Sequence, residues 1–355
     1  MNSNPAADFL RARLPEPWGD IVVAAVGIGA LVGFISLNTM FVIWLERKIC
    51  ARFQARLGPM RVGFHGLLQP VADAIKLLLK ERIRPRASDA VGYFLAPLLP
   101  LIASFLVLAV IPFGAGLQAV DLDAGMVYVS AVSGLGILGV LLGGWASNSK
   151  YSLLGSMRSG AQLFSYELSL LLSLLLVVMA SGTGSLRGVV ESQSGIFWDW
   201  WIFKLPGAGA FAFLLYLISS TAELNRGPLD LSEAESELTG GFHTEYTGMS
   251  FALFFLAEYI NLFTASALGA VFFLGGYLPF QTGIPGLDPV LAAIPGPLWL
   301  LSKAYFLIFL YMWFRWTFPR LRIDHLLALE WKILLPFSLG NLVFGATLVA
   351  LGWLL

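Results

Sequence analysis

The chain is poor in the residues that hold metals, disulfides and redox clusters. Its 355 residues include one cysteine, Cys50, and three histidines. A single cysteine excludes a disulfide framework, and an Fe–S cluster needs several thiolates, so any redox centre must lie on another chain. His65, His243 and His325 are too far apart in the sequence for a zinc site. We therefore expect no metal site.

Charged residues are scarce as well. They make up 12% of the chain, against roughly 25% in an ordinary soluble domain. The formal net charge is zero, so the composition gives no reason to expect a nucleic-acid partner. Hydrophobic residues make up 57%, which is more apolar surface than a soluble fold of this size can bury. The lipid bilayer is the expected surrounding.

Long apolar runs recur along the whole chain. A transmembrane helix needs about 20 largely apolar residues in succession. Eight runs of this kind occur, at 21–45, 91–112, 126–146, 162–181, 205–222, 250–274, 298–318 and 332–354. They predict an all-α polytopic membrane protein with eight transmembrane helices, in which residues 1–355 form a single transmembrane domain.

Lysine and arginine are distributed unevenly between the loops. The loop after the first span is the richest in both, and the loops after the third, fifth and seventh spans carry more. The loops after the second and sixth spans carry none. Because these residues accumulate in cytoplasmic loops, we expect the odd-numbered loops to be cytoplasmic and both termini to face the other side.

Two of the predicted cytoplasmic loops have an unusual pattern. In the loop 46–90, apolar residues recur at helical spacing at Leu67, Leu68, Val71, Ile75, Leu78 and Leu79. Asp73, Lys76 and Lys80 fall on the opposite face, which predicts an amphipathic helix at the membrane surface. The loop 223–249 is acidic, with Glu223, Asp230, Glu233, Glu235, Glu237 and Glu245.

Charges also occur inside the apolar runs. Glu167, Glu258 and Lys303 lie within predicted spans, and Glu46 and Glu223 lie at the ends of spans. A charge at the centre of a membrane helix costs about 2.5–3.5 kcal/mol, so such residues are rare unless paired or functional. For any single glutamate, an ion pair that fixes helix register is an equally good explanation. As a group, they favour a proton path.

The segment from Gly134 to Gly139 matches the dinucleotide-binding fingerprint G-x-G-x-x-G. It lies inside the third predicted span with no strand before it, so a nucleotide site is not expected. Small residues four apart predict close helix packing instead. This applies to Gly139 with Gly143 and to Gly29 with Gly33.

Several segments resemble signatures of a known family. Glu46-Arg47-Lys48, Arg56-Leu57-Gly58-Pro59 and Gly66 to Lys76 are similar to the first signature of the family formed by the H subunits of NADH–quinone oxidoreductase, or respiratory complex I. Asp230 to Glu235 and Tyr246 to Tyr259 resemble its second signature. Ala146 to Leu153 and Arg315 to Arg320 also match. The resemblance covers essentially the whole chain.

The resemblance implies a fold and a set of partners. The fold is eight spans with a surface helix after the first, in the cell inner membrane. The chain is then one subunit of a proton-pumping enzyme, with quinone as substrate and with flavin and Fe–S clusters on partner subunits. Those partners are the peripheral-arm Fe–S and quinone-site subunits, the small membrane subunits and the antiporter-like subunits.

The resemblance also assigns roles to particular residues. The charged region around the quinone tunnel and its coupling loop comprises Glu46, Arg47, Asp73, Arg226, Asp230, Glu233, Glu235, Glu237, Arg315 and Arg320. The carboxylates of the proton path are Glu167, Glu223, Glu245 and Glu258, with Lys303 close by. Negative charge arriving with quinone reduction would favour protonation in the acidic loop, and the change would then pass along the carboxylates.

Two other functions remain open from the sequence. One is the membrane anchor of an ion-translocating hydrogenase, which would need no quinone. The other is an independent secondary transporter, although such proteins commonly have inverted repeats and none is evident between the halves of this chain.

Overall fold

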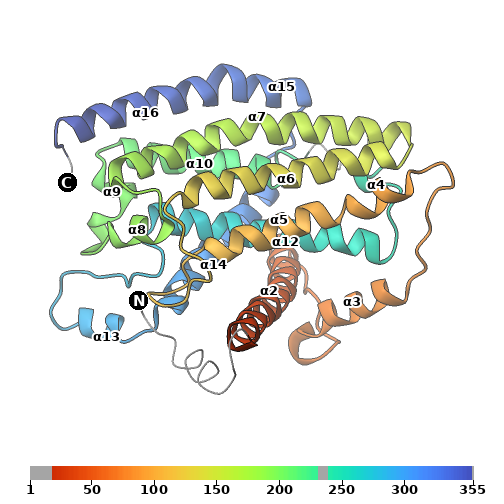
Figure 1. Ribbon diagram of the computed structural model, residues 1–355, viewed down its shortest axis with the longest axis horizontal. Coiled ribbons are helices and arrows are strands. Elements are labelled where there is room, and N and C mark those ends of the chain that lie inside the picture. Colours follow the sequence, from red (N-terminus) through yellow and green to blue (C-terminus); the bar gives the residue numbers. More distant parts are fainter. Residues whose placement is uncertain (1–17, 231–238, 354–355) are drawn as a thin grey trace.

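The computed structural model describes residues 18–230 and 239–353 (Figure 1). Within these residues the chain forms helices and no β-strand beyond one isolated bridge between Gly114 and Leu117. The helices are α2 (Trp18–Phe53), η1 (Phe64–Gly66), α3 (Gln69–Leu79), α4 (Ala90–Leu95), α5 (Leu98–Val110), α6 (Gly125–Ala146), α7 (Lys150–Ser181), α8 (Leu186–Glu191), η2 (Phe197–Asp199), α9 (Trp201–Lys204), α10 (Ala208–Glu223), η3 (Gly241–His243), α12 (Met249–Phe273), α13 (Asp288–Ala292), α14 (Gly296–Thr317), α15 (Ile323–Leu329), η4 (Glu330–Leu334) and α16 (Leu335–Ala350).

The predicted all-α membrane fold is confirmed. Seven helical stretches of the described chain are long and apolar enough to cross a membrane: α2, α4 with α5, α6, α7, α12, α14, and α15 with α16. The eighth apolar helix, α10, has 16 residues. At 1.5 Å per residue it is about 24 Å long, which is shorter than a typical hydrocarbon core of about 30 Å.

Several helices do not end where the apolar runs end. α2 continues to Phe53 rather than stopping at 45, and α7 begins at Lys150 rather than at 162. Charged side chains such as Arg and Lys are good helix formers, so hydropathy marks the end of the lipid-facing part and not the end of the helix. The second span is divided at Pro97, whose ring removes a backbone donor.

The helices alternate in direction, so the loops collect at two ends. Asp89 N–H donates to the Ala146 carbonyl at 3.0 Å, and Leu321 N–H donates to that of Pro228 at 3.2 Å. These contacts join loops 54–89, 147–149, 224–248 and 318–322 at what we call the α3 end. The other end, called the α13 end, holds α8, α9 and α13 (Figure 1). The alternation agrees with the predicted order of spans.

The predicted surface helix is present as α3, beside the end of α2 (Figure 1). Its apolar residues point outward, and Leu78 and Leu79 are 62% and 82% exposed. Arg47 of α2 pairs with Asp73 of α3 at 2.5 Å, which ties the helix to the first span. Leu67 and Leu68 precede α3, so they are not part of the helix as expected.

The glycine pattern has two different outcomes. A Cβ at Gly139 would lie 2.4 Å from Cδ of Pro100, and one at Gly143 would lie 3.2 Å from the Phe254 ring. The predicted packing is therefore confirmed for α6. A Cβ at Gly29 or Gly33 would meet no atom within 4 Å. The packing prediction for α2 is wrong within this chain, because the first half of that helix leans away from the other spans (Figure 1).

Replacing Gly139 by alanine should destabilise the contact between α6 and α5. The added methyl group has to displace the Pro100 ring, and overpacking of this kind costs about 1–3 kcal/mol. Gly134→Ala is the matched control, because a Cβ at Gly134 has open space around it. Thermal unfolding in detergent should give a lower midpoint for Gly139→Ala only. Equal midpoints for the two variants would contradict this account of the packing.

Candidate functional site

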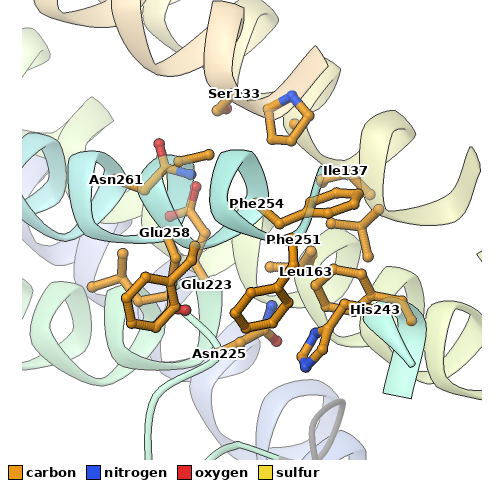
Figure 2. Close-up of a pocket in the computed structure, with 17 residues that line it drawn as sticks. Ser133, Ile137, Leu163, Glu223, Asn225, His243, Phe251, Phe254, Glu258 and Asn261 are labelled. Atoms are coloured by element: carbon orange, nitrogen blue, oxygen red, sulfur yellow. The ribbon is translucent and has the colours of Figure 1, made fainter. Parts of the chain in front are cut away.

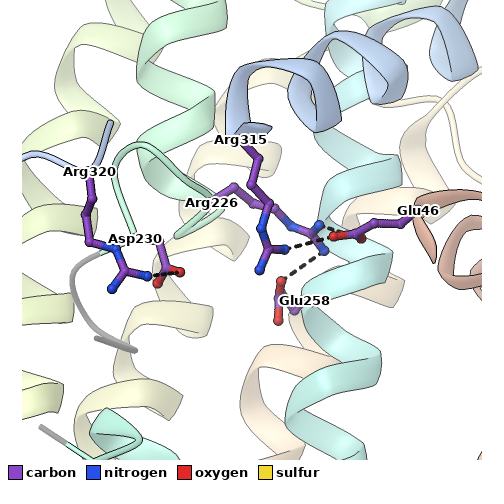
Figure 3. A network of polar contacts seen from close by, with 6 residues as sticks. All are labelled: Glu46, Arg226, Asp230, Glu258, Arg315 and Arg320. Carbon is purple, nitrogen blue, oxygen red and sulfur yellow. Dashed lines mark hydrogen bonds and ion pairs between the residues drawn. The ribbon is translucent and has the colours of Figure 1, made fainter. Parts of the chain in front are cut away.

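Arg226 lies at the centre of a buried ion network at the α3 end (Figure 3). It follows α10 by three residues, and its side chain is 1% exposed. Its Nη1 donates to Glu46 Oε2 at 2.6 Å, and its Nη2 lies 3.0 Å from Glu258 Oε1. The guanidinium carbon lies 4.6 Å from the centre of the Tyr259 ring, within the range of a cation–π contact.

This environment fixes the charge of Arg226. Burial on its own lowers the pKa of the guanidinium, but the negative charges of Glu46 and Glu258 outweigh burial and raise the pKa well above its ordinary value. Arg226 therefore remains a cation at any physiological pH. It joins the loop after α10 to α2 and to α12.

Glu46 binds two arginines. Its second oxygen, Oε1, accepts a hydrogen bond from Arg315 Nη1 of α14 at 2.8 Å (Figure 3). Arg315 is more open to solvent, with 38% of its side chain exposed. One carboxylate of α2 is thus neutralised from both α14 and the loop after α10. The preference of carboxylates for arginine reflects the paired donors of the guanidinium group.

A second ion pair lies beside this network. Arg320 Nη2 is 3.2 Å from Asp230 Oδ2 (Figure 3). Asp230 is the last described residue before the gap in the acidic loop. Glu233, Glu235 and Glu237 were predicted to belong to the same loop, and they lie outside the described residues.

A cavity of about 550 Å³ opens among these charges. It is formed mainly by α2, α12, α14 and the segment before α3. Its charged and polar lining comprises Glu46, Arg47, Cys50, Arg56, Gln69, Asn225, Asp230, Glu258 and Arg315. Pro59, Phe255, Tyr259 and Trp316 supply the apolar part. A volume of this size is typical of sites that hold a drug-sized ligand.

A second cavity, of about 280 Å³, adjoins the first (Figure 2). Glu258, Asn225 and Phe255 line both of them. Figure 2 shows Glu223, Glu258 and Asn261 together on one side of this cavity, with Phe254 and His243 on the other. Glu258 therefore stands between the Arg226 network and a space that also contains Glu223.

A third cavity, of about 80 Å³, continues into the membrane interior. Glu223, Ser133 and Asn261 line both it and the second cavity, and Glu167 lines it from α7. Ser133 Oγ donates to Glu167 Oε1 at 2.9 Å. The three cavities thus bring Glu46, Glu258, Glu223 and Glu167 into one series, although these residues come from four different helices.

Glu245 and Lys303 lie apart from this series. The backbone carbonyl of Glu245 accepts a hydrogen bond from the Tyr93 hydroxyl at 2.9 Å, and the residue lines none of the three cavities. Lys303 lies toward the α13 end. Its Nζ donates to the carbonyls of Gly276 and Leu278 at 3.0 and 2.8 Å and lies 4.3 Å from the Trp200 ring centre. The structure does not place either residue beside the other carboxylates.

His243 contributes no charge to the second cavity. Burial lowers its pKa to about 4, so the imidazole is neutral near pH 7. The edges of its ring contact Phe242 and Phe251. It therefore forms part of the aromatic wall of the cavity.

Three polar residues of the cavities and one buried acid were not predicted from the sequence. Asn225, Asn261 and Ser133 were not singled out, because each is a lone amide or hydroxyl in or beside an apolar run. Glu330 was also overlooked. It precedes the last predicted span by two residues, and its side chain is buried against α7.

Comparison with known proteins gives a consistent result. A family model described as NADH dehydrogenase matches residues 26–346. The chain is 46% identical over 348 residues to the NADH-quinone oxidoreductase H subunit of Bacteroides thetaiotaomicron, covering 98% of this chain and 96% of that one. It is 48% identical over 345 residues to the H subunit of Bacteroides fragilis, with 97% and 95% covered. A second H subunit, from Koribacter versatilis, is 43% identical over 352 residues, with 93% and 98% covered.

Replacing Arg226 by methionine should be strongly destabilising. Glu46 and Glu258 would remain buried without their shared cation, and breaking a buried pair in this way costs about 3–5 kcal/mol. Arg320→Met is the control, because that side chain is 46% exposed and exposed pairs contribute about 0–1 kcal/mol. Thermal unfolding of the purified protein should separate the two variants. Similar midpoints would show that Arg226 is not the centre of the network.

Proposed function

Because the chain belongs to the NADH dehydrogenase family and matches the H subunits of NADH-quinone oxidoreductases over nearly its full length, we propose that it admits the quinone and couples quinone reduction to proton translocation. The observation that carries this proposal is the series of three cavities. The first is large enough for a quinone ring, and the next two join the carboxylates that lead away from it.

The quinone would occupy the 550 Å³ cavity. Its ring fits beside Tyr259 and Trp316, and Arg47, Arg56 and Arg315 lie where they can stabilise negative charge on its oxygens. The substrate would arrive from the bilayer beside α3, whose outward leucines place the surface helix in the lipid interface. With one cysteine in the chain, the electrons must come from flavin and Fe–S centres on partner subunits.

Coupling would start at the Arg226 network. A reduced quinone adds negative charge next to Glu46 and competes for the arginines that neutralise it. Protonation of Glu258 would then become favourable, because this carboxylate shares Arg226 with Glu46. The second and third cavities offer the space for water that a proton needs to pass from Glu258 to Glu223 and Glu167.

The same proposal orients the chain in the cell inner membrane. The α3 end carries most of the lysine and arginine residues and would face the cytoplasm. The peripheral-arm subunits would dock there, over the 550 Å³ cavity. Small membrane subunits and antiporter-like subunits would contact the spans. The relatives described above are named for quinone reduction, which gives no support to a hydrogenase anchor or an independent transporter.

Enlarging Cys50 should obstruct the quinone. Cys50 lines the 550 Å³ cavity from α2, so Cys50→Trp should raise the KM for quinone by about tenfold or more, with a smaller effect on kcat. Cys50→Ala is the control and should keep the KM unchanged, because it only removes volume. Steady-state quinone reduction by the assembled complex measures both. An unchanged KM in Cys50→Trp would rule out this cavity as the quinone site.

Replacing Glu167 by glutamine should uncouple the enzyme. The amide can keep the hydrogen bond from Ser133, but it cannot carry a proton. Fewer protons should be translocated per quinone reduced, in vesicles that contain the assembled complex. Glu191→Gln is the control, because Glu191 lies at the α13 end with 54% of its side chain exposed. Normal pumping by an assembled Glu167→Gln complex would remove Glu167 from the proton path.

A further inference from the structure

Glu330 is a buried carboxylate that the proposed path does not use. It is 1% exposed and begins the π-helical segment η4, between α15 and α16. These two helices run along α7 (Figure 1). π-Helical turns within α-helices are uncommon and frequently occur at functional sites. The carboxyl group faces α7.

The polar contacts of Glu330 come from serine side chains. Ser169 Oγ of α7 forms a short hydrogen bond to Glu330 Oε1, and Ser338 Oγ lies 3.3 Å from Ser169 Oγ. Oε2 is buried and has no hydrogen-bond partner among the described residues. Those residues also place no Lys, Arg or His side chain within ion-pair distance of Glu330. Trp331, the next residue, bonds to Ser165 Oγ at 3.2 Å instead.

An ionised carboxylate would be very unfavourable in this position. Burying an isolated charge costs far more than one hydroxyl donor can offset. A bound metal cation would require space and several further oxygen ligands. Glu330 lines none of the three cavities described above. It is also absent from a fourth, an apolar groove of about 470 Å³ between α6, α7 and α16. A proton needs no additional space.

The site is separate from the series of cavities. Glu167 and Ser169 are two positions apart on α7, so their side chains point about 200° apart around the helix. Glu167 faces Ser133 of α6, whereas Ser169 faces Glu330. α7 therefore separates two carboxylates that lie on its opposite sides.

A polar track on α7 connects Glu330 with the α3 end. The side of the helix that carries Ser169 also carries buried polar residues at helical spacing: Ser152, Ser156, Ser159, Gln162 and Ser165. Gln162 is the informative member, because an amide is not needed for close helix packing. Its Nε2 donates to the carbonyls of Ala222 and Leu229, at 2.7 and 2.8 Å. These two residues flank the segment that contains Arg226.

We propose that Glu330 is a second proton-binding site of the membrane interior, supplied from the α3 end along the polar side of α7. This inference rests on the proposed coupling function and adds a branch to it. Glu330 holds a proton as a neutral carboxylic acid and releases it when the charge at the α3 end changes. Ser169 is the positioning residue that orients the carboxyl group.

The test is redox-induced infrared difference spectroscopy on the assembled complex, combined with proton pumping in vesicles. Quinone reduction should change the C=O band of a protonated carboxyl group, and that band should be missing in Glu330→Gln. Ser169→Ala should shift the band without removing it, because the carboxyl group remains but loses its hydrogen bond. Glu330→Gln should reduce the number of protons translocated per quinone, while the rate of quinone reduction changes less than about twofold. Glu191→Gln should leave both measurements unchanged.

An unchanged band and normal pumping in Glu330→Gln would overturn the inference. A wild-type spectrum with no such band, together with unfolding that depends on Na⁺ concentration, would also overturn it and indicate a cation site. If Glu330→Gln pumps normally and Glu167→Gln does not, only the second site is wrong. If Glu167→Gln pumps normally and Glu330→Gln does not, the second site stands and the proposed path through the cavities fails. The Ser169→Ala spectrum decides the case in which Glu330→Gln does not assemble.

Discussion

The pairing of Arg226 with Glu46 and Glu258 is the interaction on which the rest of the α3 end depends. It joins α2, α12 and the loop after α10 through one guanidinium group, and Arg315 adds α14 to the same carboxylate. The first half of α2 has few contacts with the other spans, so the charged contacts at its far end matter more for its position. A fully desolvated pair of this kind contributes little net stability, yet it strongly penalises any arrangement that breaks it. The network therefore selects one geometry for the walls of the large cavity.

The same constraint explains how the carboxylates are arranged. Apart from Glu46, each carboxylate of the series has few direct partners and faces a cavity instead. Glu258 has one arginine, and Glu167 has a serine hydroxyl. Such groups avoid the cost of an isolated buried charge by taking up a proton or by contacting water. A series of carboxylates in adjoining cavities is consequently able to exchange protons, whereas a series of tightly paired carboxylates would be fixed in one charge state.

Much of the fold could be predicted from the sequence, because the membrane imposes a simple pattern. The apolar runs predicted all eight helices, and the alternating leucines predicted α3. The ends of α2 and α7 could not be predicted from hydropathy, since their terminal residues are polar and still helical. The packing of Gly139 was predictable from its spacing with Gly143, but the same spacing at Gly29 gave a wrong prediction because that face of α2 has no neighbour in this chain.

The site was harder to predict, because its parts are distant in the sequence. Glu46 and Arg226 were both singled out as charged residues, but their contact spans 180 positions and no local pattern reports it. Lys303 was grouped with the carboxylates by its presence inside a span, whereas its actual partners are the carbonyls of Gly276 and Leu278. Glu330 gave almost no signal, since a single acid next to an apolar run resembles an ordinary helix end.

The central claim is that water can connect the carboxylates from Glu258 through Glu223 to Glu167. The most direct measurement is a cryo-EM map of the assembled complex at a resolution that shows ordered water. The account predicts water density in both the 280 Å³ and the 80 Å³ cavities, in contact with all three carboxyl groups. Cavities filled by lipid tails or by repacked side chains, with no water between Glu223 and Glu167, would contradict it.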